Sequence, residues 1–72
     1  MKNALVKRFA VNVSRLRQER KLSQEAFAEK VKISQGYVAL LENATRAPSL
    51  EMIGKLADAL GVKPSDLFKE KV

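Results

Sequence analysis

The chain has 72 residues, 46% of them hydrophobic and 31% charged, with a net charge of +6. This length accommodates one small domain with one core. The sequence contains no cysteine and no histidine, which excludes a disulfide framework, thiolate and Ser–His catalysis, and the usual zinc sites. We therefore expect a single domain over residues 1–72 that is not an enzyme, has no cofactor or metal, and depends on packing for its stability.

The positive charge is concentrated in the first half of the sequence. Residues 1–36 carry nine Lys or Arg against three acids, whereas residues 37–72 carry five of each. A polyanion is the partner that this distribution favours, although small basic domains without nucleic-acid function also exist. No apolar run approaches a membrane span and no signal-peptide core follows the start, so we expect a cytoplasmic protein with no membrane partner. No small-molecule ligand is evident.

The first predicted element is an amphipathic helix over residues 3–20. Lys7, Arg8 and Arg15 fall on its outer side. Its basic first turns are interpreted as part of this core helix rather than as a membrane anchor, because the apolar spacing continues through them. The apolar positions, which recur every three or four residues, are Leu5, Val6, Phe9, Ala10, Val13 and Leu16.

Two short helices follow, over residues 24–31 and 35–43. Ser23 and Ser34 precede them and are suited to accept a backbone N–H as N-caps. Helices this short are not stable alone and must pack together. Residues 24–43 therefore predict a helix-turn-helix, whose second helix is built to lie in a DNA groove. The predicted inner positions are Phe27, Ala28, Val31, Tyr37, Val38 and Leu41.

The remaining sequence predicts a loop and two more helices. Pro48 disfavours helix at the residue before it, so residues 44–48 are a loop. Ser49 then caps a helix over residues 50–60, and Gly61 ends it. A short helix over residues 64–68 completes an all-α, compact five-helix domain. The predicted core positions of the fourth helix are Leu50, Ile53, Leu56, Ala57 and Leu60.

The order of several short motifs resembles the Cro/C1-type helix-turn-helix family, which includes phage repressors and restriction–modification controller proteins. The resemblance covers about residues 9–69 and fixes elements on both sides of the helix-turn-helix. It is therefore more specific than a lone helix-turn-helix pattern. The matching segments are residues 16–24 (LRQERKLSQ), 27–28 (FA), 33–35 (ISQ), 41–43 (LEN), 48–50 (PSL) and 56–62 (LADALGV).

The resemblance implies that the outer face of the helix over residues 35–43 reads base edges or touches phosphates. Gln35 is the clearest candidate reader, since its amide can pair with adenine N6 and N7 for ~1–3 kcal/mol of discrimination; the alternative is a solvated glutamine. Gly36 either permits close approach to DNA or has no role. Ala39 and Leu40 are limited to apolar contacts, and Leu40 alternatively is partly buried or faces a partner protein.

Further candidates are suited to phosphate oxygens. Ser23, Gln24 and Ser34 lie at helix starts, where backbone N–H groups attract anions, although the serines also serve as caps. Asn43, Thr45 and Arg46 match a phosphate-clamping region of the family. Tyr37 has two equally favoured roles, a hydroxyl directed at a phosphate or core packing alone.

Two other features are implied by the resemblance. Arg17 and Glu42 match a largely buried ion pair that ties the first helix to the end of the third. Lys32 and Ala44 stand where glycine is common in the family. A positive φ at either residue would cost on the order of 1 kcal/mol.

The sequence therefore predicts a sequence-specific DNA-binding transcriptional regulator, with repression favoured over activation. One module of this size contacts few base pairs, so we expect a homodimer on a near-palindromic operator of double-stranded DNA. We expect the dimer to use the C-terminal third, including Val62, Leu67, Phe68 and Val72, although core packing is the competing role of Leu67 and Phe68. The alternative function is a protein-interaction module, such as the antitoxin of a toxin–antitoxin pair.

Overall fold

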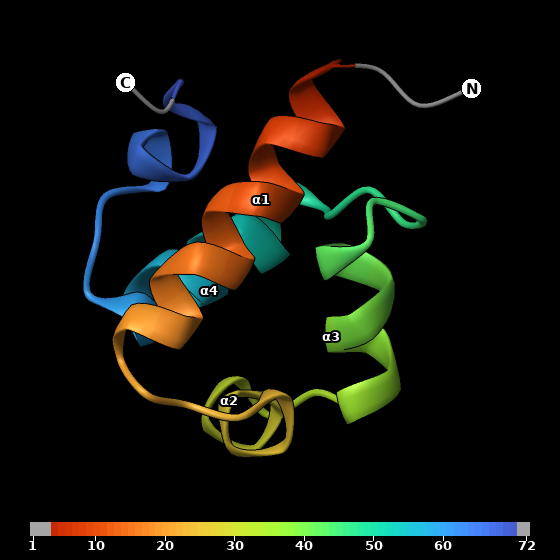
Figure 1. Cartoon of the computed structure of the whole chain (residues 1–72), viewed down its shortest axis with the longest axis vertical. Coiled ribbons are helices and arrows are strands. Elements are labelled where there is room, and N and C mark those ends of the chain that lie inside the picture. The colour runs from red at the N-terminus through yellow and green to blue at the C-terminus, as the bar shows by residue number, and fades with distance from the viewer. Residues whose placement is uncertain (1–3, 71–72) are drawn as a thin grey trace.

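In the described part of the chain, the hydrophobic spacing of the sequence produces four α-helices and one 3-10 helix (Figure 1). The computed structural model describes residues 4–70. The prediction of an all-α domain is confirmed, but the last element is a 3-10 helix rather than a fifth α-helix. It is a five-residue segment in which Asp66 N–H donates to the Lys63 carbonyl three residues back, at 2.9 Å. The elements are α1 (Ala4–Glu19), α2 (Gln24–Val31), α3 (Gln35–Glu42), α4 (Leu50–Leu60) and η1 (Pro64–Phe68).

One hydrophobic core lies between all five elements. Phe9 of α1, Phe27 of α2, Leu41 of α3, Leu56 of α4 and Leu67 of η1 are each at most 1% exposed. Since the side chains recur at helical spacing, each helix turns one apolar stripe toward this core. None of the described helices has both the length and the apolar character needed to cross a bilayer.

Two residues predicted to face the core are instead exposed. Leu5 is 53% exposed and Leu50 is 87% exposed. Each lies in the first turn of its helix. Helical periodicity predicts a core position for both because it identifies a face of the helix and not how far along the helix the packing extends.

The helix ends follow the predicted signals. The hydroxyl oxygens of Ser23, Ser34 and Ser49 each accept a backbone N–H from the first turn of the helix that follows. Gly61 ends α4 in the left-handed conformation with φ 70°. α1 ends at Glu19 and α3 at Glu42, one residue short of the prediction in each case, a difference that helix fraying makes common.

Within residues 4–70, three residues other than glycine have positive φ. Lys32 (φ 68°) and Ala44 (φ 64°) are the two positions singled out in the sequence. Lys21 (φ 60°), in the turn after α1, is a third. All three adopt a conformation that costs L-residues roughly 1–2 kcal/mol. The packing of the helices around these turns therefore stabilises a backbone conformation that these residues disfavour by themselves.

Asn12 links α1 to η1 and the residues after it through side-chain hydrogen bonds. Its side chain is 2% exposed, and its Nδ2 donates to the carbonyls of Leu67 and Lys69, at 2.9 Å each. Phe68 adds a ring contact with Phe9, with centroids 5.7 Å apart. Because these bonds satisfy a buried amide, Asn12 has a structural role that the sequence analysis did not identify.

Asp66 stabilises the start of η1. Its carboxylate pairs with the Lys69 ammonium at 2.8 Å and accepts the backbone N–H of Lys63 at 3.0 Å. Both interactions favour the charged form, and together they lower the pKa of Asp66 below its usual value, the Lys69 bond contributing most.

Candidate nucleic-acid interface

α2 and α3 form the helix-turn-helix, with α3 at the edge of the molecule (Figure 1). The turn between them closes because Lys32 takes the left-handed conformation and its N–H donates to the Ala28 carbonyl at 2.7 Å. Ile33 N–H donates to the same carbonyl at 3.0 Å. This hydrogen-bonded turn fixes the angle between the two helices and places the start of α3 at the surface.

The outer face of α3 is polar only at its beginning. Gln35 and Gly36 are exposed, while Ala39 and Leu40 are half-buried. Gln35 is therefore the hydrogen-bonding side chain that the helix presents within this face. A Cβ built on Gly36 would meet only the Ser34 hydroxyl, at 4.0 Å. The fold itself gives no steric reason for glycine at this position.

One group of candidate phosphate ligands lies around the helix starts. The hydroxyl oxygens of Ser23 and Ser34 accept the N–H groups of Ala26 and Tyr37, at 3.0 Å each. A hydroxyl that accepts in this way still has its own hydrogen to donate. Gln24 is half-buried, and its Nε2 donates to Oε1 of Glu42 at 3.1 Å. The second N–H of this amide remains for an outside acceptor.

The other group lies at the end of α3, where Asn43, Thr45 and Arg46 are exposed. Asn43 Oδ1 accepts Thr45 N–H at 2.9 Å, and Arg46 N–H donates to the Leu40 carbonyl at 3.2 Å. These bonds hold the loop against the helix end. The Arg46 guanidinium lies 5.9 Å from the centre of the half-buried Tyr37 ring, within the range of a cation–π contact.

Arg17 and Glu42 lie together beneath this surface. Arg17 Nε donates to Glu42 Oε2 at 2.7 Å and Nη2 to Oε1 at 3.0 Å. The two side chains are 11% and 7% exposed. Arg17 Nη1 also donates to the Leu22 carbonyl at 2.7 Å. The pair thus links α1 to the end of α3 and to the turn before α2, and it does not face solvent.

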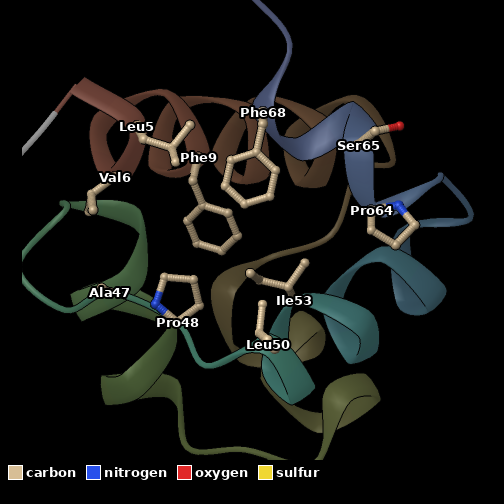
Figure 2. Close-up of a pocket in the computed structure, with 10 residues that line it drawn as sticks. All are labelled: Leu5, Val6, Phe9, Ala47, Pro48, Leu50, Ile53, Pro64, Ser65 and Phe68. Carbon is tan, nitrogen blue, oxygen red and sulfur yellow. The ribbon is translucent and has the colours of Figure 1, made fainter.

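An apolar groove, which the sequence analysis did not identify, lies on another face of the molecule (Figure 2). It has a volume of about 430 Å³, and among the described residues that line it Ser65 has the one polar side chain. The first turns of α1 and α4 supply its edges, so the exposed Leu5 and Leu50 belong to it. The lining residues are Leu5, Val6, Phe9, Ala47, Pro48, Leu50, Ile53, Pro64, Ser65 and Phe68.

The residues proposed from sequence for a dimer surface differ in their burial and position in the structure. Leu67 is fully buried, so its assignment to a surface is wrong and the competing assignment to the core is correct. Val62 is half-buried and packs against the core. Phe68 is half-buried and lines the groove. Val72 lies outside the described residues.

Known proteins resemble this chain in sequence over most of its length. The sequence profile of the family described as Helix-turn-helix matches residues 13–67. The chain is 36% identical over 64 residues to control protein C.MunI of Mycoplasma sp, covering 88% of this chain and 86% of that protein. It is 37% identical over 59 residues to the immunity repressor protein of Bacillus phage phi105, covering 82% of this chain but 41% of that protein.

A solved structure resembles the whole described fold. The restriction–modification controller protein C.AhdI from Aeromonas hydrophila superposes with a TM-score of 0.86 at 36% sequence identity, covering 92% of this chain and 100% of that chain.

Proposed function

The chain belongs to the helix-turn-helix family and is a DNA-binding transcriptional regulator, and from this premise we propose that it is a repressor or controller protein that binds a near-palindromic operator as a homodimer. The immunity repressor and the controller proteins among its relatives support this class of regulator. It has no enzymatic role.

The proposal rests on one observation, the exposed first turn of α3 between two groups of hydrogen-bond donors. Gln35 reads a base edge in the major groove, with adenine as the preferred partner of its amide. Gly36 lets the helix backbone approach the bases, and Ala39 and Leu40 add apolar contacts further along. Since only Gln35 offers hydrogen bonds there, part of the specificity comes from DNA shape.

The two flanking groups bind phosphates and set the position of α3. Ser23, Gln24 and Ser34 donate from one side of α3. On the other side Asn43, Thr45 and Arg46 donate, and Tyr37 supports Arg46 with its ring. Contacts of this kind contribute affinity without sequence preference.

A second copy of the chain covers the apolar groove. One helix-turn-helix contacts few base pairs, and two copies related by a twofold axis match a near-palindromic site. Leu50 projects at the edge of the groove with 87% of its surface exposed. A projecting side chain beside a hollow suits a twofold interface, because the same patch of each copy then fills the hollow of the other.

A salt titration of DNA binding tests the regulator proposal. Affinity for the DNA upstream of the chain's own gene should fall steeply with salt, with log K linear in log[salt]. Arg46→Ala should weaken binding to cognate and non-cognate DNA alike and reduce the slope, because it removes a phosphate contact. A change of base preference at one position, with non-specific affinity unaltered, would show that Arg46 reads a base instead.

A further inference from the structure

The positive side chains of α1 are not equivalent in the structure. Arg8 donates to Glu70 at 3.1 Å, Arg15 to Glu19 at 3.0 Å, and Arg17 is paired with Glu42. Lys7 is exposed and has no ion pair or hydrogen bond from its side chain within residues 4–70. Arg8 and Arg15 are thus paired with exposed carboxylates at the surface and Arg17 with a buried one, whereas the Lys7 ammonium has no carboxylate partner in this part of the chain.

Lys7 lies beside the end of α3. Together with Asn43 and Ala44 it lines a hollow of about 270 Å³ between α1 and the residues that end α3. In Figure 1 the first half of α1 runs alongside the loop that follows α3. A residue 36 positions earlier in the sequence therefore stands next to Asn43, one of the proposed phosphate ligands.

The end of α3 lacks positive charge of its own. The last turn contains no basic residue, and the helix dipole places partial negative charge on its final carbonyls. Glu42 adds a carboxylate there, which Arg17 neutralises. A phosphate bound next to this helix end therefore requires positive side chains from neighbouring segments. Arg46, in the loop after α3, supplies one.

We propose that Lys7 binds a phosphate of the DNA backbone next to the one held by Arg46, and so extends the phosphate contacts from the end of α3 onto α1. This inference rests on the proposed function. The long, flexible ammonium side chain suits a contact with a phosphate at a short distance from the loop. Such a contact carries no sequence preference.

The test compares Lys7→Ala with Lys63→Ala, which removes the same charge next to η1, on the other side of α1 from α3 in Figure 1. Both residues are exposed, and thermal melts verify that both variants fold. The slope of log K against log[salt] should fall in magnitude by about 0.9 for each protomer bound in Lys7→Ala. It should stay at the wild-type value in Lys63→Ala. Lys7→Arg should restore the wild-type slope.

The outcomes separate this inference from the proposed function. If the wild-type chain binds no DNA with a steep salt dependence, the proposed function fails. If Arg46→Ala reduces the slope and Lys7→Ala does not, only the assignment of Lys7 is overturned. Equal slope changes in Lys7→Ala and Lys63→Ala would also overturn it, because they would reflect net charge rather than a contact at the end of α3.

Discussion

Arg17 Nε lies 2.7 Å from Glu42 Oε2 and joins α1 to the last residue of α3. The guanidinium engages both carboxylate oxygens, and Oε1 accepts a further bond from Gln24 of α2. One carboxylate thus connects three helices. A charge pair that is almost wholly buried costs desolvation energy, but removal of one partner leaves the other charge stranded.

Glu42→Ala should therefore destabilise the domain severely. Arg17 and Gln24 would lose their shared acceptor, at a cost of about 3–5 kcal/mol. A change of this size should lower Tm by more than about 12 °C in a domain of this length. Glu29→Ala, which removes an exposed acid from α2, is the matched control and should change Tm little. A Glu42→Ala variant that melts within a few degrees of wild type would contradict a supporting role for the pair.

The sequence predicted most of the fold because local signals agreed with the helical periodicity. Ser23, Ser34 and Ser49 each cap the helix expected to follow them, and Gly61 ends α4. The buried stripes of α2 and α3 also agree with their spacing. Periodicity failed at Leu5 and Leu50, because it does not report where packing partners end.

Asn12 and Lys21 show the other limit of sequence reasoning. Asn12 lies three residues after Phe9 on the same face of α1, and this position was a signal for burial, but its bonds to Leu67 and Lys69 involve residues 55 and 57 positions away. Lys21 adopts positive φ because the helices on both sides impose the turn. The local sequence does not identify a hydrogen-bond partner that is distant in the chain. It also does not show where tertiary packing imposes a backbone conformation that a residue disfavours by itself.

The internal bonds of the candidate interface could not be predicted from the sequence. The spacing placed Gln35, Gly36, Ala39 and Leu40 on the outer face of α3, where the first two are exposed and the other two are half-buried. That Gln24 is bound to Glu42 and that Lys7 stands beside Asn43 required the three-dimensional arrangement. Both relationships join segments that are distant in sequence.

Gly36→Ala should have opposite effects on the stability of the domain and on its affinity for DNA. Alanine should stabilise α3 by up to ~1 kcal/mol, since its Cβ meets nothing closer than 4.0 Å. If the bare backbone approaches DNA, the same methyl group should lower operator affinity. Gly54→Ala in α4 is the control, because there too a Cβ has free space; it should raise stability and leave affinity unchanged. Urea titration and band shifts measure the two effects. Equal affinities in both variants would remove the role of Gly36 in close approach.

Gln35→Ala should cost ~1–3 kcal/mol of operator affinity and relax preference at one base pair in each half-site. The reason is that the exposed amide is the hydrogen-bonding group of the first turn of α3. Gln18→Ala provides the comparison, since Gln18 is an exposed glutamine of α1 that donates to Ser14 Oγ at 3.0 Å. Selection from a randomised operator library measures the preference. A Gln35→Ala profile identical to wild type would exclude Gln35 as a reader.

Leu50→Asp should weaken the homodimer by at least about 30-fold, equivalent to about 2 kcal/mol. The charge would be buried in the groove of the second copy, whose lining offers almost no polar partner. Val11→Asp is the matched control, because Val11 is also a large exposed apolar residue (58%) and lies outside the groove. Sedimentation should show the shift toward monomer in Leu50→Asp alone, with helical content by circular dichroism unchanged in both variants.

Operator binding should require two protomers, with half-sites about one helical turn apart. Leu50→Asp dimers as tight as wild type would place the interface elsewhere. A wild-type chain that stays monomeric at high concentration and binds one half-site tightly would refute dimerisation and favour an interaction module that uses the groove for another protein.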